Sequence, residues 1–301
     1  MVAVATLVYQ RRPSILGALM RGMMMSRRRK VDRIPPDISV SWRNLRATQR
    51  LLDRYRQYTG QSEKKVLPFL LPQVMVFPIH LVILTHKDFP FPLLGSLQIR
   101  NQFLSHRPIV TGEEMEAECH VVEQREAEKG VEVDLHTTVW ASGEKSWESL
   151  VTYYYKGAAG GNKVRPGQEL PPDVWPGEDE ASCVTWRAPG FYARRFGRLS
   201  GDFNPVHFFP VFARRMRFQG AIHHPHLILG QVMDRLGLED KGGNGELSLW
   251  LKGPVYYNAG LRLCSREIGR EKFFALYVDG DDRPAMLGGW NQEPPVSLWK
   301  D

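Results

Sequence analysis

The chain has 301 residues, of which 43% are apolar and 24% are charged. This composition can bury the core of one large domain or two of ordinary size, and it excludes wholesale disorder. The net charge of +7 favours an anionic partner, such as nucleic acid, a phosphorylated cofactor or a thioester carrier. No zinc-finger, RNA-reading or helix-turn-helix pattern occurs in the sequence, which argues against nucleic acid.

We interpret residues 1–44 as a basic N-terminal arm. It holds seven Lys or Arg residues up to Lys30 and no acidic residue before Asp32. Its apolar runs are too short to span a bilayer. The pattern fits a mitochondrial presequence, and it equally fits a partly helical arm that docks on the folded body or on an anionic membrane surface. The sequence leaves both alternatives open.

The three cysteines, Cys119, Cys183 and Cys264, are far apart and odd in number. They match neither a disulfide framework nor a metal knuckle, so we expect buried, inert thiols and a reducing compartment. A cytoplasmic protein follows from this reading, and a mitochondrial one from a cleaved arm.

Residues 45–157 predict helices followed by antiparallel strands. A helix over Leu45–Tyr58 leads into Thr59-Gly60-Gln61, and a second, over Val74–Thr85, is apolar nearly all round and therefore buried. A strand over Leu97–Ile109 follows, and strands over 131–141 and 147–155 are expected to form a hairpin.

Residues 158–182 are a Gly/Pro-rich linker by composition, and residues 183–301 repeat the first plan. A helix over Gly190–Leu199 leads into Ser200-Gly201-Asp202, an apolar helix spans Pro225–Leu236, and four strands follow at 246–252, 261–268, 273–278 and 286–290. We expect an α+β protein in which each sheet wraps its apolar helix and the two sheets join into one surface.

The segment from Ser200 to His207 concentrates chemistry in one turn. Gly201 and the Asn204-Pro205 pair keep it out of regular helix. Asp202 and His207 can therefore converge on one water molecule, as an acid and a base that act on it together.

This segment, with Tyr192-Ala193, Ala213, Phe218 and Ala221-Ile222-His223-His224, resembles the MaoC-like hydratase/dehydratase family, double hot-dog type. The resemblance implies (R)-specific, reversible hydration of trans-2-enoyl thioesters, or dehydration of 3-hydroxyacyl thioesters, with no metal or redox cofactor. The substrate would be an acyl-CoA or acyl-carrier-protein thioester. Asp202 and His207 would bind the water, and Asn204 would orient it or hold the turn. A backbone N–H at the start of the central helix would polarise the thioester carbonyl.

The first half resembles the inactive repeat of such proteins, because Gln61 replaces Asp202 and Val66 stands where the histidine would be. We expect it to shape the acyl tunnel, which leaves one site per chain. The second half departs from the family at Pro225, where the usual glycine would supply the N–H. A non-catalytic acyl-thioester-binding protein is therefore an alternative, and a thioesterase is another.

The remaining candidates concern substrate binding and assembly. The histidine cluster near residue 225 has no zinc-ligand spacing, so no metal is expected. The arginines after the turn either meet the phosphates of coenzyme A or an acidic carrier, or form a solvated helix face. A homodimer is compatible with the sequence. The residues assigned to substrate binding are Gly201, His224, Pro225, His226, Arg214 and Arg217.

Overall fold

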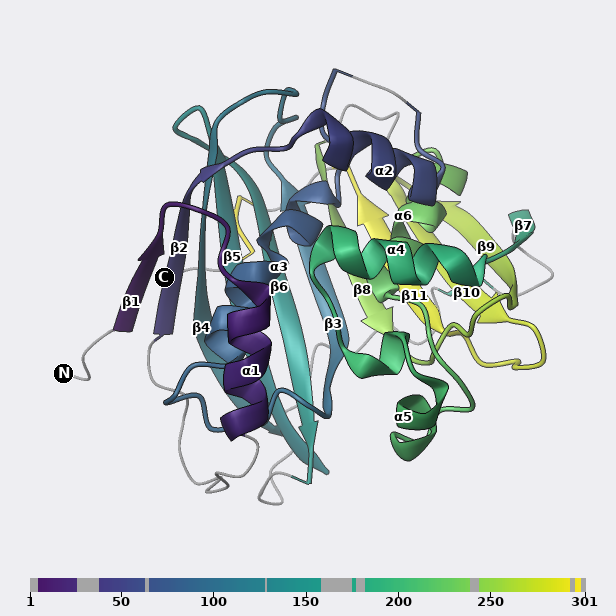
Figure 1. Ribbon diagram of the computed structural model, residues 1–301. Helices are drawn as coiled ribbons and strands as arrows, with labels where there is room; N and C mark the ends of the chain where they lie inside the picture. The colour runs from purple at the N-terminus through teal and green to yellow at the C-terminus, as the bar shows by residue number, and fades with distance from the viewer. Residues whose placement is uncertain are drawn as a thin grey trace.

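The computed structural model describes residues 5–25, 38–62, 65–127, 129–157, 175–176, 182–238, 244–292 and 296–298. In these residues, a single sheet runs through both halves of the chain in the strand order β1-β2-β4-β5-β6-β3-β8-β11-β10-β9-β7. The helices lie together on one side of it (Figure 1). The predicted continuous sheet is confirmed.

The N-terminal half carries two strands and three helices before its main strands. Its elements are β1 (Ala5–Tyr9), α1 (Ile15–Met25), β2 (Ile38–Leu45), α2 (Gln49–Thr59), α3 (Leu71–Leu84), β3 (Ser96–Ser105), β4 (Met115–Ala127), β5 (Gly130–Ala141) and β6 (Glu144–Lys156).

The C-terminal half has a similar order with a longer irregular segment before its central helix. Its elements are β7 (Ser182–Arg187), α4 (Gly190–Ser200), the 3-10 helix η1 (Pro205–His207), α5 (Pro210–Arg215), α6 (Pro225–Arg235), β8 (Gly245–Leu251), β9 (Gly260–Ile268), β10 (Glu271–Val278) and β11 (Met286–Asn291).

The two halves are related by a pseudo-twofold axis at the junction of β3 and β8. These strands pair antiparallel, with Gln102 opposite Ser248. Outward from this junction, the order β3-β6-β5-β4-β2 on one side corresponds to β8-β11-β10-β9-β7 on the other. Strand β1 has no counterpart, and it extends the sheet by parallel pairing with β2.

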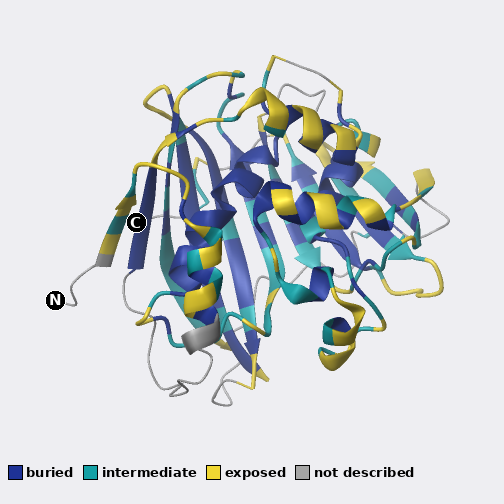
Figure 2. Cartoon of the chain, in the orientation of Figure 1, coloured by how far each residue is buried: buried dark blue, intermediate teal, exposed yellow. Residues whose placement is uncertain are grey.

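The central helix α3 is buried along its whole length (Figure 2). Its side chains pack on the inward residues of the curved sheet, such as Val133, Leu135 and Val151. A helix wrapped on nearly every side must be apolar nearly all round, which is the pattern that the sequence shows. The counterpart α6 is buried over most of its length in the same way.

Four strands escaped the sequence prediction: β1, β2, β4 and β7. The predicted boundary between the arm and the first half, at residue 44, falls inside β2, so the N-terminal half begins earlier than expected. Strand β4 alternates apolar and polar residues from Met115 to Val121, a period that the sequence prediction overlooked, and β7 is short and mostly exposed. Their place is fixed by pairing with β2, β5 and β9, which the local pattern does not reveal.

Cys183 and Cys264 form a disulfide between the edge strand β7 and its neighbour β9. The prediction of three free thiols is therefore wrong, and the inference of a reducing compartment loses its support. The pairing partner lies 81 residues away in sequence, a distance that spacing rules for small cysteine frameworks do not cover. Cys119 is free and buried, and burial raises the pKa of its thiol to about 12.

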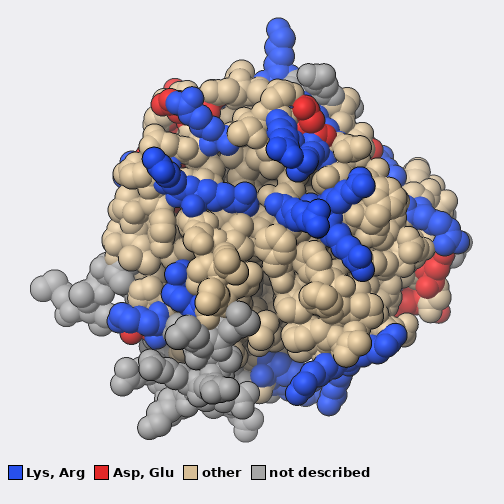
Figure 3. All heavy atoms as spheres, viewed as in Figure 1, with Lys and Arg blue, Asp and Glu red and all other residues tan. Residues whose placement is uncertain are grey.

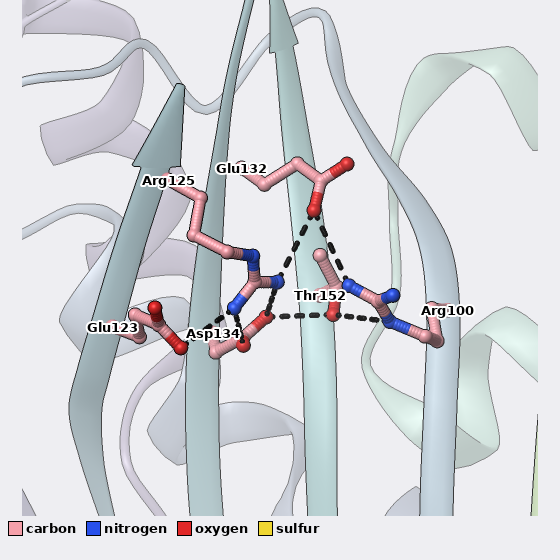
Figure 4. Close-up of polar contacts among 6 residues, drawn as sticks. All are labelled: Arg100, Glu123, Arg125, Glu132, Asp134 and Thr152. Carbon is pink, nitrogen blue, oxygen red and sulfur yellow. Dashed lines mark hydrogen bonds and ion pairs between the residues drawn. The ribbon is translucent and has the colours of Figure 1, made fainter. Parts of the chain in front are cut away.

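The outer face of the N-terminal sheet carries a charged network that joins four strands. Arg125 of β4 binds Asp134 and Glu132 of β5, and Arg100 of β3 binds Glu132 from the other side. Residues 131, 133 and 135 point to the core, so these charged side chains point away from it. The network stabilises the sheet and lies apart from the helices. Figure 4 shows its members: Arg100, Glu123, Arg125, Glu132, Asp134 and Thr152.

The predicted linker lies almost wholly outside the described residues. Of it, Trp175 packs against Trp250 and Phe273. None of the described helices is both long and apolar enough to cross a membrane.

Candidate active site

Helix α4 ends at a glycine that turns the chain toward the site. Gly201 has a φ of 86°, the left-handed conformation that ends many helices. The hydroxyl of Ser200 donates to the carbonyl of Phe196 at 3.0 Å and accepts from the amide of Asp202 at 3.1 Å. The small polar residue and the glycine together direct Asp202 out of the helix.

The next turn is built by Asn204 and Pro205. The amide of Asn204 donates to Oδ1 of Asp202 at 3.1 Å, and its side-chain oxygen accepts from the amide of Val206 at 3.3 Å. Asn204 thereby caps η1, whose first residue is Pro205. The position of Asn204 fits the second of its two predicted functions, holding the turn.

Asp202 and His207 face each other across a short gap. Oδ2 of Asp202 lies 3.6 Å from Nε2 of His207, and the side chains are 23% and 6% exposed. Nδ1 of His207 lies 3.0 Å from the carbonyl oxygen of Ile222. A carbonyl only accepts, so Nδ1 carries a proton, and in the neutral form of the ring Nε2 is the nitrogen that can act as a base.

Asp202 is held ionised by its neighbours. Burial raises its pKa, but the hydrogen bond and charge of His207, the charge of His224 and the amide of Asn204 together lower it well below the ordinary value. A carboxylate and an imidazole separated by 3.6 Å are spaced to share a water molecule.

His224 supports this pair from behind. Its ring stacks on that of His207, with centroids 3.9 Å apart, and its Nε2 lies 3.0 Å from the carbonyl oxygen of Asp202. Burial, helped by the charge of His207, lowers its pKa to about 3, so it stays neutral. His223 is also tied to the backbone, at the carbonyl of Ala188, and burial lowers its pKa to about 4.

Helix α6 points its N-terminus at the same place. Pro225 is its first residue, so the first amide is missing. His226 follows, and burial lowers its pKa to about 4. Its Nε2 is buried and has no hydrogen-bond partner among the described residues. Its amide lies in the first turn, where the helix offers no acceptor.

These groups border a mostly apolar cavity of about 280 Å³ between the halves. Asp202, His207 and His226 lie at one part of its wall. The N-terminal half contributes Leu81, Leu93 and Tyr153, among others. A site of this kind binds an apolar chain next to a few polar groups.

Not all predicted site residues reach this cavity. Asn204 and Pro225 line it together with the pair, whereas Gly201 and His224 support the turn from outside it. Arg214 and Arg217 are exposed and lie away from the lining, next in the chain to the cavity residue Phe218. Their predicted contact with an anionic group stays a prediction.

Sequence reasoning missed Tyr153 and Leu19 as cavity residues. Tyr153 belongs to β6, and its hydroxyl is hydrogen bonded to Gln98 and His80 at 3.1 and 3.3 Å. Leu19 comes from α1, which the sequence left without an assigned site. The alternation of inward and outward residues in β6 was a signal for Tyr153. Nothing in the sequence alone indicated that Leu19 lies at the cavity.

Asp202, His207 and His224 also form a possible metal-binding group, with ligand atoms within 4.8 Å of one another. Two of their ring nitrogens already bind backbone carbonyls. The remaining donors are one carboxylate and two nitrogens, the number that catalytic zinc sites use, so the expected absence of a metal stays a prediction.

The comparisons with known proteins agree with this description. Residues 192–275 match the family model for the MaoC like domain. A 172-residue stretch is 26% identical to 3-hydroxyacyl-thioester dehydratase X of Mycobacterium tuberculosis, covering 56% of this chain and 59% of that protein. The aligned stretch thus spans less than two thirds of this curated relative.

Two solved structures from the same organism share the architecture. The crystal structure of HtdX has a TM-score of 0.72 at 21% identity, over 84% of this chain and 99% of that one. A conserved protein with a double hotdog fold has a TM-score of 0.50 at 12% identity, over 94% and 92% of the two chains. The fold and the cavity between the halves therefore define a double hot-dog protein. Within this fold, residues 192–275 of the C-terminal half are a MaoC-like domain.

Proposed function

We propose that the protein hydrates trans-2-enoyl thioesters and, in reverse, dehydrates (R)-3-hydroxyacyl thioesters. The observation that carries this proposal is the pair of Asp202 and His207, which face each other at 3.6 Å on the wall of a mostly apolar cavity. The name of the curated relative, a 3-hydroxyacyl-thioester dehydratase, supports the same chemistry.

The reaction needs one water molecule and no net proton. The carboxylate of Asp202 and Nε2 of His207 each accept a hydrogen bond from the water, which aims its oxygen at the β carbon. As the C–O bond forms, the pair takes one proton and the double-bond electrons move to the thioester oxygen. The pair then returns that proton to the α carbon on the same face. No redox step occurs.

The thioester oxygen gains negative charge during this reaction and requires a donor. The N-terminus of α6 provides a positive potential there, but Pro225 cannot donate. The amide of His226, one residue on, is the remaining backbone donor of that turn. The loss of one preorganised donor typically slows such reactions by about 100- to 1000-fold.

Pro225 therefore supports a second candidate function, in which the protein binds acyl thioesters without converting them. In both cases the substrate carrier is anionic. Figure 3 shows Lys and Arg side chains over the helix face, with few acidic ones. Exposed arginines on α4, on α5 and just after α5 contribute to this charge: Arg194, Arg195, Arg198, Arg214, Arg215 and Arg217.

An absorbance assay separates the candidates. Purified protein is incubated with crotonyl-CoA and with longer enoyl-CoAs, while the conjugated absorbance and free thiol are followed together. Hydration removes the absorbance without releasing thiol. Release of thiol would indicate a thioesterase, and measurable binding without either change would indicate the non-catalytic protein.

A further inference from the structure

Helix α1 is amphipathic, and its apolar face packs onto the cavity region. Ile15, Ala18, Leu19 and Gly22 share one face at helical spacing. Ala18 is 1% exposed and packs against Phe77 and Leu81 of α3. The opposite face is open to solvent: Leu16 is 69% exposed.

The start of α1 is fixed to the turn that carries Asp202. A guanidinium nitrogen of Arg12 donates to the carbonyl of Ser200 at 3.2 Å, at the negative end of α4. A Cβ built on Gly201 would lie 2.3 Å from Cδ1 of Ile15, so the two segments are in close contact. The far end of the apolar face is equally tight, because a Cβ on Gly22 would lie 3.2 Å from Leu93.

Between these two anchors, Leu19 reaches the cavity. It is the residue of α1 that lines the cavity, where it joins Phe77, Leu81 and Leu93 in the apolar wall of the N-terminal half. The proton-transfer pair belongs to the wall of the other half. An acyl chain whose thioester end lies at Asp202 and His207 therefore extends toward the wall that contains Leu19.

We infer that Leu19 limits the length of acyl chain that the cavity accepts. The side chain occupies volume that additional methylenes of a longer chain would need. The arm that carries it is thus part of the binding site, and its removal would open the cavity. This inference rests on the proposed function for the chemistry at the pair, but it concerns binding and can be measured without turnover.

The test uses the full chain with Leu19→Trp and Leu19→Ala. Dissociation constants are measured for saturated acyl-CoAs from butyryl to palmitoyl, which cannot be hydrated. Leu19→Trp should weaken binding of the long chains by about fourfold for each methylene displaced, with little effect on butyryl-CoA. Leu19→Ala should shift the optimum to longer chains.

Leu16→Trp and Leu16→Ala are matched controls, because Leu16 lies one turn away on the solvent face of the same helix. They should leave the series of dissociation constants unchanged. Thermal unfolding of each variant shows whether it is folded, and Leu19→Ala keeps the test valid if the tryptophan variant does not fold.

An unchanged series in a folded Leu19 variant, or an equal shift in the Leu16 control, overturns the inference. Enoyl-CoA hydration by the same variants keeps the two proposals apart. A length-dependent shift in binding without any hydration in the unsubstituted protein would reject the proposed reaction and leave the function of Leu19 intact.

Discussion

Helices α2 and α4 end in the same way, but only α4 leads into a pair of proton-transfer groups. Thr59 donates its hydroxyl to the carbonyl four residues back at 2.8 Å, as Ser200 does at 3.0 Å. Gly60 and Gly201 both turn left-handed, with φ of 90° and 86°. After them, Gln61 donates to the carbonyl of Gly230 in α6 at 3.3 Å, whereas Asp202 faces the cavity.

The lengths of the following loops explain the difference. Pro72 lies 12 residues after Gly60, whereas Pro225 lies 24 residues after Gly201. The longer loop contains η1 and α5, and η1 presents His207. The same fold therefore serves as a scaffold in both halves, and the additional loop residues supply the base in one of them.

The carbonyls at the helix ends show a second difference. In α2, the carbonyl of Tyr58 accepts from Gln231 of the opposite half at 2.9 Å. In α4, the carbonyl of Ser200 accepts from Arg12. Arg12, which precedes α1, thus ties the N-terminal segment to the end of α4.

The largest expected effect comes from matched variants of the two halves, one group of which should lose activity and the other stability. Asp202→Asn and His207→Gln should each lower kcat/KM for hydration by roughly 100- to 10,000-fold, because each removes a proton-transfer group. Gln61→Ala, the matched change in the other half, should lower the unfolding temperature and leave the rate within a few fold. Steady-state kinetics and thermal unfolding of the three variants decide this; equal losses of rate in all three would contradict it.

The prolines at the start of the central helices give a second pair. Pro225→Gly restores an N–H beside the cavity and should raise the hydration rate, by up to about 100- to 1000-fold if the missing donor limits it. Pro72→Gly makes the same change in α3 and should leave the rate unaffected. An unchanged rate in Pro225→Gly would mean that another donor, such as the His226 amide, serves the carbonyl.

The disulfide sharpens the comparison of the two sheet edges. It joins β7 to β9, whereas the corresponding β2 and β4 are joined by hydrogen bonds and side chains, with Ser39 opposite His120. Changing Cys183 and Cys264 to serine should lower the free energy of unfolding by about 2–4 kcal/mol. Chemical denaturation measures this, with buried Cys119→Ala as the control that keeps the disulfide; equal stability of the double variant and the native chain would show that the bridge does not stabilise the fold.

Acid should destabilise the protein through its buried histidines. Burial, the largest cause in each case, lowers the pKa of His223 and His226 to about 4 and that of His80 and His224 to about 3. Once unfolded, these residues take up protons below their ordinary pKa of 6.5, whereas the folded chain does not until the lowered values are reached. The contribution of these neutral histidines to the free energy of unfolding is therefore fully present above pH 6.5, and it declines as the pH falls toward 4.

The decline is up to roughly 1.4 kcal/mol per pH unit for each histidine. Three of the four histidines lie in the C-terminal half. His80→Gln should therefore remove only the contribution of one histidine to the slope of the free energy of unfolding against pH. Urea denaturation at several pH values measures it, and a stability that stays flat or rises on acidification would contradict the burial of these neutral rings.

Much of the fold followed from local patterns, and the reasons are physical. The apolar α3 and α6, the hairpin β5–β6 and the turn after Gly201 are each specified by their own residues. The disulfide and the place of α1 depend on partners far away in sequence. Asp202 and His207, five residues apart, were predictable for the same reason, and the register of β6 carried a signal for Tyr153, whereas the place of Leu19 was not predictable.

The central claim concerns one water molecule activated by Asp202 and His207, and product analysis in deuterated water tests it most directly. Crotonyl-CoA is incubated with the protein, and the product is examined for its configuration and its isotope content. The account predicts (R)-3-hydroxybutyryl-CoA with deuterium at the α carbon, and none with His207→Gln. A hydroxyacyl product formed equally well by Asp202→Asn and His207→Gln, or no product from the native chain, would contradict it.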